Sequence, residues 1–464
     1  MKLHTTDRLT RIISVKISSL YTLFPWYASG LWSLRILGLN CRRAMIIRHF
    51  KMKEFKKYRY SSITVMIIVS FVFLFTKCIN RGTWETTVVK NFKGQKFAGS
   101  ATCASCHKNI YDSHRKTAHY LTSGKASESN IKGSFEPGKN TFNYEMGTAV
   151  TMEKRNDSFY QVEYHSGKER DAYPMDIVLG SGMRGQSYLY WMRNQLFQLP
   201  VSYFGGTNQW SNSPGFPNTV LFNRTITTRC LECHSTNAKV ISPPEINPEQ
   251  FDASQMIYGV DCEKCHGPAA EHVEFQTQNP TATIAKYIIN PSRLSRQQNM
   301  DLCTSCHGGR LFKKRPPFEF MAGDTLLNFF DTSHITLNPN SIDVHGNQSG
   351  LLRASKCFRM SETLTCNTCH NTHENERGKT ALFSQRCMSC HNEEHKSFCK
   401  FADKVGAEIK SNCIDCHMPL SASGIISVAL PGDTALTAAM IRSHFITIYP
   451  DRANKVLSLM KKKH

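Results

Sequence analysis

The sequence predicts a mainly α fold with long loops around a core that is not built from side chains alone, together with a β-rich insert at about residues 135–225. Three observations support this. One short cysteine and histidine pattern occurs seven times, and Asn, Pro and Ser clusters at 243–248 and 338–341 punctuate the segments between copies. Strand-like alternation is found within the interval between the first two copies. The apolar share, 40% of 464 residues, is low for a chain of this length.

The chain begins with a basic segment. Its 57 Lys and Arg against 36 Asp and Glu give a net charge of +21, but residues 1–77 alone hold 14 Lys and Arg against 2 Asp and Glu. The rest of the chain carries 43 against 34. Because most of the excess lies in one sixth of the chain, the charge does not indicate a nucleic-acid partner, and we expect none.

Residues 52–78 have the layout of an export signal. Met52 opens a short basic run, and 63–76 follow without a charge, a stretch too short to cross a bilayer comfortably. Cys78 stands where a lipid-bearing cysteine would stand, although Lys77 occupies a place where a small residue is usual. Residues 1–51 are interpreted as a non-native leader upstream of a true start at Met52; the alternative is an extra membrane-associated segment.

Fourteen of the 18 Cys belong to the repeated pattern C-x-x-C-H, whose copies we number first to seventh in chain order. The paired cysteines are Cys103 and Cys106, Cys230 and Cys233, Cys262 and Cys265, Cys303 and Cys306, Cys366 and Cys369, Cys387 and Cys390, and Cys413 and Cys416. The histidines that follow are His107, His234, His266, His307, His370, His391 and His417.

This pattern is the attachment signature of c-type haem. Two thiols three positions apart lie on one side of a helical turn, where each can form a thioether to a vinyl group of haem, and the next His ligates the iron. Zinc is the alternative, but a zinc site does not require His after the second Cys, and all seven copies have it. A disulfide framework is typical of much shorter chains. We therefore expect seven covalently attached haem c groups, and export, because in bacteria this attachment takes place outside the cytoplasm.

The insert between the first and second motifs has strand periodicity. Tyr160, Val162 and Tyr164 alternate with polar residues, and a turn at 156–157 separates them from a second alternating segment, which predicts a hairpin. A further strand-rich stretch runs over 188–204, broken near 193–194, and glycines at 180–185 indicate a tight loop. The role of this module is not written in its composition.

Outside the insert, we expect residues 79–464 to form one multihaem domain. Up to fourteen propionates would offset the positive charge of this region. Cys357 and Cys399 belong to no motif, and they either form a disulfide or remain two thiols.

Histidines outside the motifs are candidates for the second axial ligand of each iron, and imidazole on both sides gives a low-spin, electron-transferring iron. The seven candidates are His119, His272, His334, His345, His373, His395 and His444. His165 is set aside because it shares a polar strand face with Gln161 and Glu163, and His114 stays open. His373 follows its motif histidine by three residues, too few to pass round the porphyrin edge, so it can cap only a neighbouring haem.

The stretch FAGSATCASCHKNIYDSHRKTAH resembles the first-haem signature of multihaem c-type cytochromes related to the tetrahaem cytochrome of hydroxylamine oxidation. CLECHSTN and CEKCHGPAAEH are similar to the next two motifs of that family, CNTCHNTHEN to its C-x-x-C-H-x-x-H element, and CIDCHMP to its closing motif. The resemblance covers most of 98–420 and implies distal ligation by His119, His272 and His373. Seven motifs exceed the four of the simplest members, and none has Lys in place of His.

Two main functions remain open at this stage. The first is an electron carrier with stacked bis-His haems in the periplasm or at the outer-membrane surface, whose partners are redox proteins or a membrane quinol oxidase. The second is an oxidoreductase that acts on a small nitrogen or sulfur species at one open haem; its catalytic residues are unknown from sequence. A third interpretation makes the β-rich insert a recognition module that the haems serve.

Overall fold

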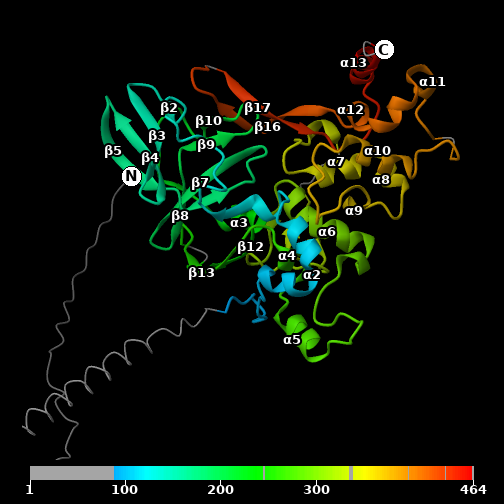
Figure 1. Cartoon of the computed structure of the whole chain (residues 1–464), viewed down its shortest axis with the longest axis horizontal. Coiled ribbons are helices and arrows are strands. Elements are labelled where there is room, and N and C mark those ends of the chain that lie inside the picture. The colour runs from blue at the N-terminus through cyan, green and yellow to red at the C-terminus, as the bar shows by residue number, and fades with distance from the viewer. Residues whose placement is uncertain (1–87, 244–245, 334–337, 396, 434, 462–464) are drawn as a thin grey trace, which may run out of the picture. The chain divides into compact units, whose positions relative to one another are not determined.

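The computed structural model describes residues 88–464, apart from 244–245, 334–337, 396, 434 and 462–464 (Figure 1). The chain divides into two compact units, Met1–Trp84 and Glu85–His464, of which the first lies outside the described residues. The expected leader, the export signal and Cys78, the expected lipid-bearing cysteine, also lie outside the described residues. His334 lies outside them too, within the gap at 334–337. Among the described residues, no helix has the length and apolar character to cross a membrane.

Two sheets form the β-rich region. The larger one comprises β1 (Ser123–Lys125), β6 (Ile177–Leu179), β7 (Gly185–Met192), β8 (Gln195–Gln198), β9 (Val201–Phe204), β10 (Gln209–Asn212) and β11 (Arg224–Thr225). The smaller one is ordered β2 (Thr141–Asn143), β3 (Thr148–Arg155), β4 (Ser158–His165) and β5 (Lys168–Pro174). All their pairings are antiparallel. The region runs over about 123–212, between the first two motifs as expected, but it begins earlier than the expected 135.

The expected "mainly α" class is wrong, because the fold is mixed α/β. Three two-stranded sheets lie among the motifs in addition to the insert. They pair β12 (Ser235–Val240) with β13 (Phe251–Tyr258), β14 (Phe312–Lys313) with β15 (Phe330–Asp331), and β16 (Leu420–Ala429) with β17 (Leu436–Arg442). Irregular register in β12–β13 and β16–β17 breaks the period of two by which strands are recognised.

The predicted hairpin is confirmed as β3 and β4, joined through Asn156, whose φ of 53° suits a tight hairpin turn. The polar side of this hairpin is partly buried, however. Gln161 is fully buried and Glu163 nearly so. The Gln161 amide donates to the carbonyl oxygen of Val201 at 2.6 Å and accepts from the Val201 N–H at 3.0 Å. One side chain thus satisfies a buried backbone unit of β9, in the other sheet.

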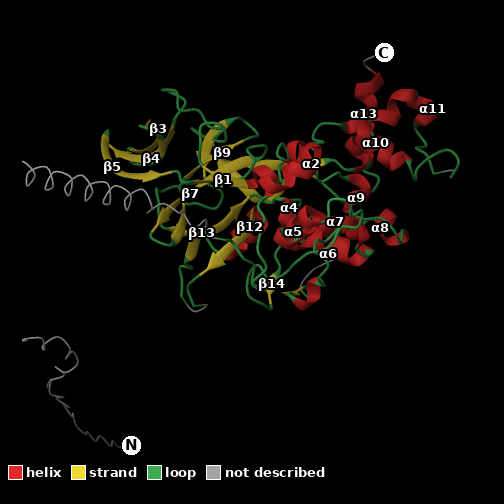
Figure 2. Ribbon diagram, turned by 60° about the horizontal axis from the view of Figure 1, so that its bottom comes forward, coloured by secondary structure: helices red, strands yellow, loops and turns green. Residues whose placement is uncertain are grey.

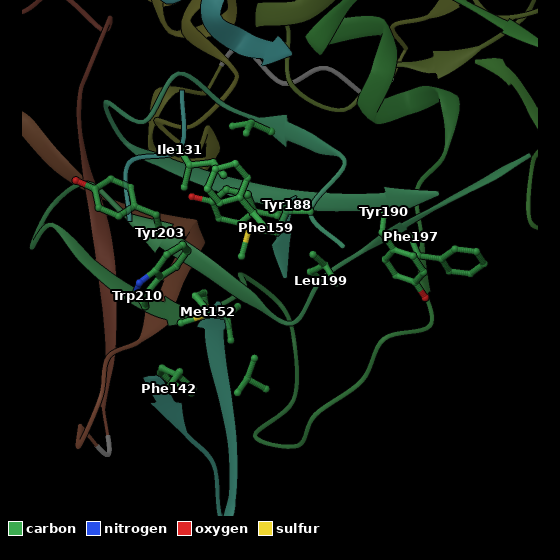
Figure 3. Close-up of a cluster of buried hydrophobic side chains, with 14 of the residues drawn as sticks. Ile131, Phe142, Met152, Phe159, Tyr188, Tyr190, Phe197, Leu199, Tyr203 and Trp210 are labelled. Atoms are coloured by element: carbon green, nitrogen blue, oxygen red, sulfur yellow. The ribbon is translucent and has the colours of Figure 1, made fainter. Parts of the chain in front are cut away.

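The main side-chain core lies between these sheets. Fifteen buried residues pack together, among them Met152, Tyr188 and Trp210, which Figure 3 draws from both sheets. Gly133 lies against this core, because a Cβ there would approach the Trp210 ring to 2.1 Å. The β16–β17 hairpin joins the region through contacts of Val428 and Ala439 with Phe204.

Most helices gather on the other side of the described chain from the large sheets (Figure 2), whereas one, at 228–234, packs on the larger sheet through Leu231. The helices are α2 (Ser100–His114), α3 (Thr228–His234), α4 (Cys262–His266), α5 (Ala270–Gln278), α6 (Arg296–His307), α7 (Gln348–Ala354), α8 (Lys356–Met360), α9 (Cys366–Cys369), α10 (Thr380–Met388), α11 (Ala402–Val405), α12 (Ile414–His417) and α13 (Pro450–Lys461). Buried apolar clusters here are small: Met300, Leu352 and Phe358 form one, and Ile342, Val344 and Leu351 another. Side chains alone therefore do not fill this part of the fold.

Candidate haem sites

A single cavity of about 2720 Å³ collects most of the motifs. Its volume is several times the roughly 300–1,000 Å³ of an ordinary small-molecule pocket. The first four motifs line it with both cysteines and the histidine, and the fifth with His370. Six histidines outside the motifs also line it: His114, His119, His272, His345, His373 and His444. The cavity therefore brings attachment thiols and candidate iron ligands together from residues 103 to 444.

Helices that carry the second, fourth and fifth motifs contact one another in that order. The Cys306 thiol on α6 lies 3.8 Å from the carbonyl oxygen of Glu232 on α3, so the fourth motif adjoins the second. The Asn367 amide on α9 donates to the side-chain oxygen of Asn299 on α6 at 3.1 Å, so the fifth motif adjoins the fourth. The Cys366 thiol reinforces this contact at 3.8 Å from the sulfur of Met300.

The series continues to the end of the motifs. Arg386 on α10 donates to the carbonyl oxygen of Cys369 at 2.6 Å, which joins the fifth and sixth motifs. The Cys413 backbone N–H donates to the hydroxyl of Ser384 on α10 at 2.9 Å, which joins the sixth and seventh. The order in space is therefore second, fourth, fifth, sixth, seventh.

Glu263, inside the third motif, binds the backbone that leads into the first motif. Its buried carboxylate accepts backbone N–H bonds from Ala98 at 2.8 Å, Gly99 at 2.9 Å and Ala269 at 2.8 Å. Burial nevertheless raises the pKa of Glu263 above its usual value, because loss of water outweighs these bonds. Sequence reasoning missed this residue, since it fills a variable position of the motif.

Thiols of neighbouring motifs also meet directly. In four pairs the partner thiol is the main cause that raises a cysteine pKa: Cys103 acts on Cys262, Cys306 on Cys233, Cys366 on Cys303, and Cys413 on Cys387. No disulfide joins any of the sixteen cysteines of the described residues, Cys357 and Cys399 included. Groups attached to paired thiols would be close neighbours. No three His, Cys, Asp or Glu side chains of the described residues gather as a bare metal ion requires.

Several motif histidines are oriented through Nδ1. That atom lies 2.8 Å from the hydroxyl of Thr122 in His234, 2.8 Å from the carbonyl oxygen of Ile289 in His266, and 2.9 Å from the carbonyl oxygen of Thr447 in His417. A carbonyl oxygen can only accept, so in His266 and His417 the proton lies on Nδ1 and Nε2 keeps its lone pair, the usual arrangement of a metal-bound imidazole.

Three motif histidines face histidines from outside the motifs. The ring centres of His119 and His307 are 6.1 Å apart, those of His266 and His373 6.1 Å, and those of His370 and His444 6.2 Å. Two metal–nitrogen bonds of about 2.0–2.1 Å, plus roughly 1.1 Å from each nitrogen to its ring centre, span about 6.2–6.4 Å. The donor set thus fits an iron held between two imidazoles.

Burial favours the neutral form of five of these six imidazoles. Burial, with a smaller contribution from neighbouring histidines, lowers the pKa of His119 and of His444 to about 4. Burial likewise lowers the pKa of His266, His370 and His373. An iron ligand must be unprotonated, so the environment favours the ligating form at neutral pH.

The remaining predicted ligands are more scattered. His272 lines the cavity, with Nδ1 2.9 Å from the carbonyl oxygen of Lys286. His345 lines it too, and its burial lowers its pKa. His395 is exposed, with Nδ1 2.7 Å from the side-chain oxygen of Asn392. The structure does not bring His395 to the cavity wall.

The two histidines that the sequence did not assign differ in their surroundings. His165 is exposed at the end of β4, with Nδ1 3.2 Å from the Thr148 hydroxyl. His114 is buried, and its ring nitrogens lie 3.4 and 3.1 Å from the carbonyl oxygens of Thr372 and Val260. Backbone oxygens therefore face both ring nitrogens of His114.

Positive charge gathers at one part of the cavity wall. Arg184, Arg377 and Arg442 all line it. Burial lowers the pKa of Arg184 first, and repulsion from the other two guanidinium groups adds to the shift. Such a group of arginines fits the carboxylates of haem propionates. The sequence did not indicate this cluster, because its three arginines lie far apart in the chain, from 184 to 442.

Comparison with known proteins shows which proteins the chain resembles. Residues 218–267 match the family described as cytochrome c554 and c-prime. Residues of this chain are 26% identical over 194 positions to the multiheme cytochrome MtrA of Shewanella baltica (strain OS185), a match that covers 40% of this chain and 51% of that protein. The chain thus spans about half the length of that curated relative. The crystal structure of the outer cell wall cytochrome OcwA aligns with a TM-score of 0.47 and 14% identity, covering 78% of this chain and 82% of that one.

The chain is thus similar to multihaem c-type cytochromes, and its C-x-x-C-H motifs are the attachment signature of c-type haem. Within that class, its second and third motifs lie in the segment that matches the cytochrome c554 and c-prime family.

Proposed function

We propose that the chain is a heptahaem c-type cytochrome that passes single electrons through bis-His haems, outside the cytoplasm. The observation that carries the proposal is the unbroken contact between successive motif helices, from the second motif through the fourth, fifth and sixth to the seventh. Neighbouring attachment sites would hold haems close to one another, and electron transfer over a long path requires such closeness.

Each motif would hold one haem by two thioethers and one imidazole. Bound haem supplies a one-electron Fe(III)/Fe(II) couple, whose potential depends on axial ligands, burial and nearby charge. The chain's part is to orient imidazoles through Nδ1, as in His234 and His266, and to supply cationic groups such as Arg184 for the propionates. Differences in these surroundings predict a broad spread of potentials.

Export and partners are part of the proposal. Attachment of c-type haem outside the cytoplasm favours export led by 52–78, to the periplasm or the outer-membrane surface, with Cys78 as a possible lipid anchor. Redox proteins or a membrane quinol oxidase would exchange electrons with the chain. Expression from Met52 should still yield exported, haem-loaded protein, whereas loss of haem on removing 1–51 would contradict the leader interpretation.

Intact mass under denaturing conditions tests the central claim. We expect the mature chain plus seven haems; a chain without haem would overturn the proposal. Electron paramagnetic resonance of the oxidised protein should show low-spin iron, and a redox titration should be reversible. A high-spin signal that shifts on adding nitrite, hydroxylamine or tetrathionate would instead favour an enzyme.

A further inference from the structure

Three histidine pairs join a motif to a residue outside every motif. In each pair one ring belongs to a C-x-x-C-H histidine, His307, His266 or His370, which the motif already commits to an iron. The partners, His119, His373 and His444, come from three different parts of the chain. Another histidine contact, between His114 and His373, includes no motif histidine.

The partner of His373 follows from chain geometry. His373 lies three residues after His370, and axial ligands of one iron must approach from opposite faces of the porphyrin. A three-residue link does not pass round the macrocycle, so His373 cannot serve the fifth haem. The structure turns its ring toward His266 of the third motif, with 15° between the planes. His114 also comes near, at 6.2 Å and 71°, but backbone carbonyl oxygens face both of its nitrogens.

We propose that His119, His373 and His444 are the distal ligands of the irons whose proximal ligands are His307, His266 and His370, respectively. This pairing rests on the proposed function, since it requires bound haem.

The pairing makes the fifth motif a junction. His370 ligates one iron and His373, one turn of chain later, ligates the iron of the third haem, so the two haems share a short segment. His119 comes twelve residues after His107, and it ties the first motif to the fourth haem in the same way. The first and third motifs are already joined through Glu263. They therefore meet the series of contacting motifs at the fourth motif and the fifth motif.

The angles between ring planes distinguish the three irons. They are 15° for His266 with His373, 30° for His370 with His444, and 64° for His119 with His307. The angle between axial imidazole planes sets the anisotropy of a low-spin Fe(III) signal. The fourth haem should therefore give a signal distinct from those of the third and fifth.

Removing one haem at a time tests the assignment in the full chain. Cys262→Ser with Cys265→Ser abolishes the third attachment site, and intact mass verifies the loss of one haem. In that background, His373→Ala should leave the amount of low-spin iron unchanged, because its iron is already absent. In the parent chain, and in a background with Cys366→Ser and Cys369→Ser, His373→Ala should convert one haem equivalent from low spin to high spin.

Free imidazole should restore the low-spin signal of the His373→Ala protein, which separates a missing ligand from misfolding. His119→Ala with Cys303→Ser and Cys306→Ser gives an independent version of the test, and His165→Ala is the control expected to change nothing. Loss of low-spin iron on His373→Ala in the background that lacks the third haem would overturn the pairing. So would an unchanged parent spectrum. A parent chain without haem would overturn the proposed function instead.

Discussion

Glu376 and Arg386 form a two-pronged ion pair between the fifth and sixth motifs. Both guanidinium Nη atoms donate to the carboxylate, and Nη1 also donates to the carbonyl oxygen of Cys369. The Glu376 side chain is 5% exposed and that of Arg386 25%. The Glu376 carboxylate accepts a further bond from the Asn371 backbone N–H, so one pair fixes the segment on which His370 and His373 stand.

Glu376→Gln should destabilise the protein by about 3 kcal/mol, because it leaves a largely buried guanidinium without its anion. The hydrogen bond from Arg386 is the main cause that holds the pKa of Glu376 below its usual value. The contribution is therefore present above the unfolded pKa of about 4.3 and is lost as the pH falls through the lower folded pKa. Denaturant unfolding of both proteins should show a gap that closes in acid. Glu374→Gln, at an exposed neighbour, should change stability by less than about 0.5 kcal/mol; an equal effect would contradict the role of the pair.

Glu263→Ala should loosen the joint between the first and third motifs. Three backbone N–H groups lose their acceptor, and each buried unsatisfied donor costs about 1–3 kcal/mol. Glu263→Gln keeps one carbonyl oxygen in place, so the loss should be smaller. Hydrogen exchange of the amides of Ala98 and Gly99 measures the effect locally. Equal protection in the Ala variant and the parent would contradict this account.

Gln161→Leu should destabilise the β-rich region by about 2–4 kcal/mol while leaving the haem spectrum unchanged. The substitution removes both hydrogen bonds to Val201 and leaves its buried N–H and C=O unpaired. Unfolding followed by tryptophan fluorescence reports on this region, because Trp210 lies in its core. A shifted spin state of the iron would show that the two regions are coupled more tightly than we expect.

Cys357 and Cys399 should be the described cysteines that react with an alkylating reagent in the unfolded, haem-loaded protein. Both are free thiols, and neither stands in a C-x-x-C-H motif. Peptide mass analysis should find the reagent on these two residues and haem on the motif peptides. Protection of both until a reductant is added would indicate a disulfide between them.

Local sequence rules predicted the parts of the fold that depend on near neighbours. The turn at Asn156 and the break at Arg193 both fall where the sequence placed them, and both residues have positive φ. The strands β12 and β16 were missed because bulges interrupt their alternation. The burial of Gln161 on β4 was not predicted, because its partner is a backbone unit forty residues away. No periodicity reports such a distant acceptor.

The site divides in the same way. Attachment residues could be named because two thiols and an imidazole lie within five consecutive positions. Distal ligands come from remote segments, so sequence could offer a set of histidines but no partner for each. The ring of His444 lies near that of His370 because the chain after β17 comes back toward the fifth motif. That path is visible only in the tertiary structure. The cation cluster of Arg184, Arg377 and Arg442 is hidden for the same reason.

The uneven placement of buried side chains has a consequence for how a cell makes this protein. The β-rich region carries its own core of fifteen buried residues, so we expect it to fold soon after it emerges from the membrane. Its edge carries Thr122 and Ser123, which contact His234, so this folding gathers the early motifs first. The later motifs have small clusters only, and they remain open to the enzymes that attach haem. Maturation would thus proceed from the N-terminal side. Each attached haem would provide an apolar surface against which the next segment of the chain packs.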